Sequence, residues 1–199
     1  MFFLARLLAR LDRNCGHLAS LGFLLITLAG FLHALWKLIL ATTELNIPVL
    51  HHSLLIFTAP GFVLMAWAVW NTFHRGPSGT PVWVVPVIVI VVGCGAAAIN
   101  ALSKGGQRWL YILLGLTTLA QTATAFLLAW QAWRRGLQLA IGLLVFYLVV
   151  IVVQAGFLHL FYPSTTLQWI EQFSSALAWS AFAFATRQLE QSITNKKTQ

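Results

Sequence analysis

Charged residues are scarce along the whole chain. Asp, Glu, Lys and Arg make up only 8% of the 199 positions, whereas a soluble domain carries roughly a quarter. The few charges fall between long apolar runs, hydrophobic residues reach 59%, and the mean hydropathy is +0.83. This composition leaves no room for a separate soluble domain and predicts an integral membrane protein.

Acidic residues are the rarest of the charged ones. The chain has only Asp12, Glu44, Glu171 and Glu190, and none of them lies deep inside an apolar run. Proton-coupled transporters usually place an Asp or Glu within the membrane, so this scarcity argues against a carboxylate-driven transporter. It also argues against catalysis by paired carboxylates. Because the chain has no GxSxG, HExxH, Walker or dinucleotide-binding motif either, no enzyme class is indicated.

Cysteine is nearly absent as well. Cys15 precedes the first apolar run and Cys94 lies inside the third. We expect them at different depths and therefore predict no disulfide. No CxxC motif indicates dithiol chemistry or a zinc site.

Six apolar runs are what the chain does contain. A helix needs about 20 apolar residues to cross a hydrocarbon core roughly 30 Å thick, and the short connections here are rich in Gly, Pro, Ser or Thr. We predict an all-α fold, a polytopic bundle of six transmembrane helices forming a single domain over residues 1–190. The predicted spans are Leu18–Leu40, Val49–Phe73, Val82–Leu102, Trp109–Trp133, Leu137–Phe161 and Leu167–Thr186.

The net charge of +8 indicates how the chain is oriented in the membrane. Nucleic acid is excluded as a partner because the 12 Lys and Arg residues sit at span ends and the loops are too short to build a groove. Positive charge accumulates on the cytoplasmic side of membrane proteins. With both termini inside, nine basic residues lie on the cytoplasmic side and three outside. This N-in/C-in orientation fits a multi-pass protein of the bacterial inner membrane, with the lipid bilayer as its first partner. The outer three are Lys37, Lys104 and Arg108.

Both ends of the chain differ from the spans. Residues 1–14 place arginines on one helical face and leucines opposite, which predicts an amphipathic segment lying at the membrane interface. The apolar run that follows is too long for a cleaved signal peptide. Residues 191–199 are polar and predict a disordered cytoplasmic tail.

Two backbone features fall inside the spans. Pro60–Gly61 interrupts the second span and would either break the helix at a cavity or kink it in the ordinary way. We favour the ordinary kink, because no matching break occurs elsewhere. Small residues from Gly93 to Ala98 predict close helix packing in the third span.

Histidine is the informative residue. Four of the six histidines fall toward the outer side in the predicted topology, together with Lys37 and Glu171. Ionisable groups at membrane depth are costly and often functional. The four are His33, His51, His52 and His159.

A repeated pentapeptide connects two of these histidines. Residues 29–33 and 155–159 both read Ala-Gly-Phe-Leu-His. Spans one and five run in the same direction, so the repeat places His33 and His159 at matching depth. Two such imidazoles predict axial haem ligands or a copper or iron site. Gly30 and Gly156, three residues earlier, would let a flat macrocycle approach the backbone. Chance, or an old duplication relating spans one–two to five–six, explains the repeat equally well.

Two glutamines lie deep in the spans. Gln121 shares a helical stripe with Thr117 and Thr124 in span four, and Gln154 lies in span five. The stripe either lines a polar pathway or forms hydrogen bonds between helices. We favour hydrogen bonding.

The first two spans contain three sequence motifs. They are Gly22-Phe23-Leu24-Leu25, Leu50-His51-His52-Ser53, and Gly61-Phe62-Val63-Leu64 with Trp70-Asn71. These motifs resemble those of the NnrS family of haem- and copper-containing membrane proteins. Family members carry Glu-Met where this chain has Ser53-Leu54, and usually have twelve spans. The resemblance implies that His51 or His52 binds metal and that the protein acts under nitrosative stress.

Three functions remain open from the sequence. The leading hypothesis is a membrane protein that binds haem b or copper or iron, in electron transfer or respiratory stress, with Lys37 as partner of a propionate or another anion. The second is a small-solute carrier or channel subunit. The third is a non-catalytic assembly or scaffold subunit. The sequence leaves homo-oligomerisation and membership of a larger membrane complex open.

Overall fold

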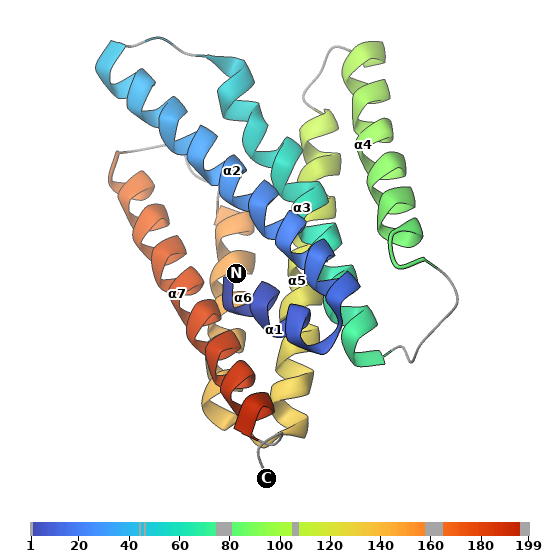
Figure 1. Cartoon of the computed structure of the whole chain (residues 1–199). Coiled ribbons are helices and arrows are strands. Elements are labelled where there is room, and N and C mark those ends of the chain that lie inside the picture. The colour runs from blue at the N-terminus through green and yellow to red at the C-terminus, as the bar shows by residue number, and fades with distance from the viewer. Residues whose placement is uncertain are drawn as a thin grey trace. The chain divides into compact units, whose positions relative to one another are not determined.

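The computed structural model describes residues 2–43, 45, 47–74, 81–104, 108–157 and 165–195. Every regular element in these ranges is an α-helix (Figure 1). The helices are α1 (Phe2–Leu11), α2 (Arg13–Thr43), α3 (Pro48–His74), α4 (Val84–Lys104), α5 (Arg108–Arg134), α6 (Gln138–Phe157) and α7 (Thr165–Asn195).

The predicted all-α class is confirmed. Each of the six predicted spans overlaps one of the helices α2 to α7, and residues 158–161 of the fifth lie outside the described residues. The count of six membrane crossings stays a prediction. Within the described residues, α2, α3, α4 and α5 are long and apolar enough to cross a membrane. A polypeptide in lipid must satisfy its backbone hydrogen bonds within the segment, which is why an apolar run of this length becomes a helix.

The chain divides into two compact units. One contains residues Leu8–Thr124, and the other contains Met1–Leu7 together with Ala125–Gln199. The single domain stays a prediction.

A tight turn opens the Leu8–Thr124 unit. The Asp12 carboxylate accepts a hydrogen bond from the Asn14 backbone N–H at 2.8 Å and so caps the start of α2. Beyond the turn, Gly16 faces Ala9 so closely that a Cβ on Gly16 would lie 2.4 Å from the Ala9 Cα. Only glycine allows this approach, so Gly16 holds the end of α1 against α2.

Helices α2 and α3 run antiparallel and cross at two glycines (Figure 1). A Cβ on Gly22 would lie 2.6 Å from the Gly61 carbonyl oxygen, and a Cβ on Gly61 would lie 2.7 Å from Ile26 Cγ1. Small residues allow this backbone contact between membrane helices. Helix α3 continues through Pro60 to His74 without interruption, as expected for an ordinary proline kink.

Small residues also bring α4 and α5 against α3. Ala59, Ala97 and Leu113 form a buried cluster contributed by the three helices. A Cβ on Gly93 would lie 2.7 Å from Leu116 Cδ2, which agrees with the close packing predicted for this stretch. The other side of α4 is exposed and apolar, including Val91, Val92 and Leu102.

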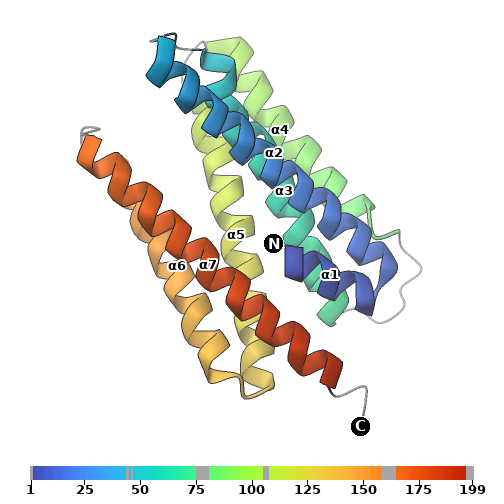
Figure 2. The ribbon, with the colours of Figure 1, turned by 60° about the vertical axis from the view of Figure 1, so that its left-hand side comes forward.

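Helices α6 and α7 lie side by side in the second unit (Figures 1 and 2). Tyr147 of α6 is 1% exposed and packs edge-on against Trp179 and at a tilt against Phe182 of α7. The Phe2–Leu7 part of α1 contacts the C-terminal turns of α7. There Arg6 Nε lies 3.5 Å from Glu190 Oε1, and the Arg187 guanidinium lies 6.0 Å from the centre of the Phe3 ring.

Both ends of the chain are helical within the described residues. The arginine face of the predicted interfacial segment is exposed, but Leu4 and Leu8 opposite it are fully buried within the protein. At the other end, α7 continues to Asn195, five residues into the predicted disordered tail. It does so because Leu189 and Ile193 are buried on its inner face. Residues 196–199 lie outside the described residues.

Candidate histidine site

His33 lies on α2, one turn after the exposed glycine Gly30. This open position at Gly30 is called the open strip. The His33 ring is half-buried and tilts by 32° against Trp36 at 5.3 Å between ring centres. A Cβ placed at Gly30 would meet nothing within 4 Å. The backbone of α2 is therefore open to a flat group at Gly30, next to His33. Lys37, one turn beyond His33, is partly exposed.

The partner predicted for His33 lies beyond the described residues. Helix α6 ends at Phe157, so Gly156 stands in its last turn, and His159 follows in the segment that the structure does not describe. The predicted pairing of His33 with His159 therefore stays a prediction. The side chain of Glu171, near the start of α7, also falls outside the described residues.

His52 occupies a different environment, near the start of α3. Its ring packs edge-on against Trp109 of α5, with 5.2 Å between ring centres and an interplanar angle of 73°. This geometry is a favourable aromatic contact in itself, and it ties α3 to α5. The side chain of His51 lies outside the described residues.

The remaining two histidines are exposed. His17 lies near the start of α2, and His74 ends α3, where its ring stacks on Trp70 at 4.3 Å. Within the ranges that the structure describes, no group of three or more His, Cys, Asp or Glu side chains is placed to hold a metal ion. An axial pair of histidines on a haem needs only two such groups.

The deep glutamine of α6 forms hydrogen bonds between helices. Gln154 Nε2 donates hydrogen bonds to Ser174 Oγ at 2.7 Å and to Ser175 Oγ at 3.0 Å, so it links α6 to α7 as expected. The threonines beside Gln121 do not link helices. Thr117 and Thr124 are buried and donate to the carbonyls of Leu113 and Ala120, four residues earlier in the same helix. A hydroxyl on an apolar helix satisfies itself locally in this way.

One polar cluster was not predicted from the sequence. Asn71, near the end of α3, is 7% exposed, and its Nδ2 donates toward Cys15 Sγ at 3.8 Å. The Cys15 thiol in turn donates to Asp12 Oδ2 at 3.5 Å. The signals were an Asp at a helix start and an Asn inside an apolar run, and 56 residues of chain separate Asn71 from Cys15. The cluster therefore pins the start of α2 to the end of α3.

The described part of the site thus consists of two histidine environments in the Leu8–Thr124 unit, one beside the open Gly30 strip and one against Trp109. Comparison with protein-family models, with curated proteins and with solved structures finds no match to this chain.

Proposed function

We propose that the chain spans the bacterial inner membrane six times, with α6 and α7 as its fifth and sixth spans. The outward surface of α6 is apolar, including Val145, Val149 and Val152. On α7 the exposed apolar residues Ile170, Phe173, Leu177 and Phe184 extend over about 21 Å at a rise of 1.5 Å per residue. Gln172 and Ser180 are exposed between them, and the Ser180 hydroxyl donates to the Ala176 carbonyl of the same helix. Ser174 and Ser175 are hydrogen-bonded to Gln154 of α6.

An even number of spans places both termini on one side of the membrane. The contacts of Arg6 with Glu190 and of Phe3 with Arg187 support this, because they join the first helix to the last turns of the final one. The bias of basic residues then favours the cytoplasm as that side.

We propose further that the protein binds haem b, or a copper or iron ion, through histidines near the outer side. The observation that carries this proposal is the repeated Ala-Gly-Phe-Leu-His, together with the open strip at Gly30 beside His33. His33 and His159 would be the ligands, and Lys37 would neutralise a propionate. A bound haem would supply one-electron chemistry, which fits electron transfer or a respiratory or nitrosative stress response.

A second site at the start of α3 belongs to the same proposal. The resemblance to the NnrS family implies a metal ligand at His51 or His52. His33 lies ten residues before the end of α2, and His52 lies four residues after the start of α3. At 1.5 Å per residue, His33 lies about 15 Å along α2 from its C-terminal end, and His52 lies about 6 Å along α3 from its N-terminal end. Because these two helix ends follow one another in the chain, the histidines lie at different distances from them, which supports two sites.

A scaffold subunit is the second candidate, and one observation favours it. Both described histidines of the outer half pack against tryptophan rings, His33 against Trp36 and His52 against Trp109. Histidines with a purely structural role would do the same.

Absorption spectroscopy distinguishes the two. The detergent-purified protein, from cells supplied with haem precursors, iron and copper, is measured oxidised and after dithionite reduction, with elemental analysis of the same sample. We expect a haem signal that His33→Ala and His159→Ala abolish and that the exposed His17→Ala retains. A colourless protein without stoichiometric metal would favour the scaffold and refute the cofactor proposal.

A further inference from the structure

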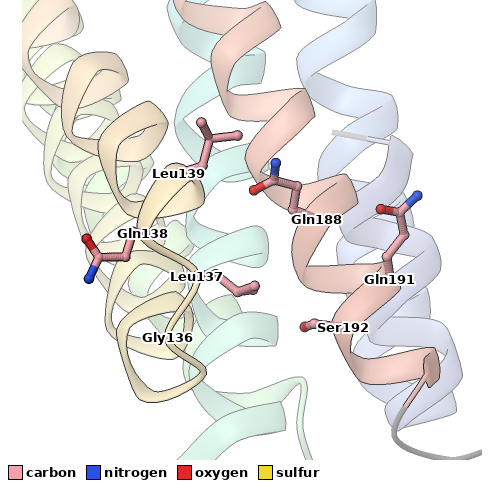
Figure 3. A pocket seen from close by; sticks show the side chains of 7 residues that line it. All are labelled: Gly136, Leu137, Gln138, Leu139, Gln188, Gln191 and Ser192. Atoms are coloured by element: carbon pink, nitrogen blue, oxygen red, sulfur yellow. The ribbon is translucent and has the colours of Figure 1, made fainter.

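An open pocket lies between α6 and the last turns of α7 (Figure 3). Its volume is about 450 Å³, within the range of roughly 300–1,000 Å³ typical of ligand pockets. Leu137 and Leu139 form the apolar side, and Gln188, Gln191 and Ser192 supply amide and hydroxyl groups from α7. Gln138, at the rim, points away from α7.

Basic residues flank this pocket. Arg134 and Arg135 directly precede Gly136 on its edge, and Arg187 directly precedes Gln188. All three are exposed. Two rest on aromatic faces, since the Arg134 guanidinium lies 5.8 Å from the Trp130 ring centre and that of Arg187 lies over Phe3. The Arg135 side chain makes no ion pair within the described part of the chain.

The backbone holds the two neighbouring arginines in place. The Leu137 N–H donates to the Ala132 carbonyl at 3.0 Å, and the Gly136 N–H donates to the Trp133 carbonyl at 2.9 Å. With Gly136 at φ +70°, this is a Schellman motif that ends α5 sharply. The turn therefore fixes the backbone of Arg134 and Arg135 next to Gly136 at the edge of the pocket.

Negative charge is kept away from the pocket. Glu190 is the one carboxylate in the last three turns of α7. Its side chain is 10% exposed and lies 3.5 Å from Arg6. The net charge around the opening is therefore positive.

The pocket also lies at the boundary between apolar and charged surface. On α7 the exposed apolar residues end at Phe184, and on α6 they begin at Leu139. In a membrane this boundary falls at the headgroup level. Basic pockets between helices on the cytoplasmic side are suited to anionic lipid headgroups.

We propose that this pocket binds the headgroup of an anionic phospholipid of the cytoplasmic leaflet. Arg135, Arg134 and Arg187 attract the phosphate, while the Gln188 amide donates a hydrogen bond to a headgroup oxygen. Leu137 and Leu139 contact the upper acyl chains. This inference rests on the proposed position of α6 and α7 in the membrane and is independent of any haem or metal.

The test counts lipids bound to the full-length protein by native mass spectrometry. Detergent-purified protein is titrated with phosphatidylglycerol, with phosphatidylcholine of the same acyl chains, and with inorganic phosphate. An arginine near the membrane surface contributes about 1 kcal/mol to anionic lipid binding, which corresponds to about fivefold in affinity. We expect about fivefold weaker phosphatidylglycerol binding in Arg135→Gln, and about 25-fold in the double variant Arg134→Gln/Arg135→Gln.

Two further variants separate the pocket from general charge. Arg108→Gln removes the same charge at the opposite end of α5, about 39 Å along the helix from Arg134 at 1.5 Å per residue, and should bind phosphatidylglycerol normally. Ser192→Phe should block binding by filling the pocket. Equal weakening in Arg108→Gln, equal binding of both lipids, retained binding in a folded Ser192→Phe, or phosphate binding as tight as lipid binding would each overturn the proposal. Reporter fusions test the topology separately.

Discussion

Replacing Gly22 by alanine should loosen the α2–α3 pair. The added methyl would lie 2.6 Å from the Gly61 carbonyl oxygen, about 0.8 Å short of the 3.4 Å at which ordinary contact begins. The obstacle is backbone and cannot turn aside, so the two helices must separate. Overpacking of this kind costs about 1–3 kcal/mol, and we expect Gly22→Ala to be destabilised by that amount.

Substitutions at two other glycines serve as controls for Gly22→Ala. A methyl at Gly93 would meet the Cδ2 of Leu116, the end of a flexible side chain, so Gly93→Ala should cost about 1 kcal/mol or less, at the low end of overpacking. Gly115 is exposed with nothing within 4 Å of its Cβ position. Gly115→Ala should therefore gain about 0.5–1 kcal/mol from the lower backbone entropy of alanine.

The assay is reversible unfolding in mixed micelles with increasing SDS, followed by the fluorescence of the nine tryptophans. The expected order of stability is Gly115→Ala, wild type, Gly93→Ala and Gly22→Ala. If Gly22→Ala matched Gly115→Ala, the close α2–α3 crossing would be wrong.

Three other outcomes are expected. Gly136→Ala should lower the free energy of unfolding by about 1–2 kcal/mol, because Gly136 has φ +70°, where a residue with a Cβ is strained. An unchanged SDS midpoint would contradict the Schellman turn. Gln154→Leu should lower the free energy of unfolding by about 1 kcal/mol, because hydrogen bonds between membrane helices average about 0.6 kcal/mol each and Gln154 donates two across α6–α7. In a Ser174→Ala/Ser175→Ala background the same substitution should cost nothing. An undiminished loss of stability there would exclude the bonds. Alkaline phosphatase fusions should be active after residues 45, 106 and 163 and inactive after 77 and 199, and activity at the C-terminus would rule out six spans with both ends inside.

The helices themselves could be predicted from the sequence. The run Leu18–Leu40 became α2 (Arg13–Thr43), and Val49–Phe73 became α3 (Pro48–His74). Apolar length decides these elements because a spanning segment must satisfy its own backbone. The ends were less predictable, since the polar continuation of α7 to Asn195 depends on the burial of Ile193.

The candidate site could be predicted only as a set of residue types. The repeat selects His33 and His159, but periodicity does not say which neighbours they meet. The structure adds the open strip at Gly30 and the tryptophans beside His33 and His52. No local pattern shows that Asn71 meets Cys15, or that the start of α6 and the end of α7 form a pocket beside Arg135, because the residues involved lie far apart in the sequence.

The sequence by itself determined the all-helical class, the positions of the helices and the placing of basic residues at their ends. Only the tertiary structure decided that Gly22, Gly61 and Gly93 make close helix contacts while Gly30, Gly95 and Gly115 face open space. It also decided that Leu4 and Leu8 of α1 are buried within the protein. The physical reason is that lipid and protein interior are equally apolar. Hydrophobicity therefore marks a helix but not the face by which it packs, and that face depends on partners contributed by distant parts of the chain.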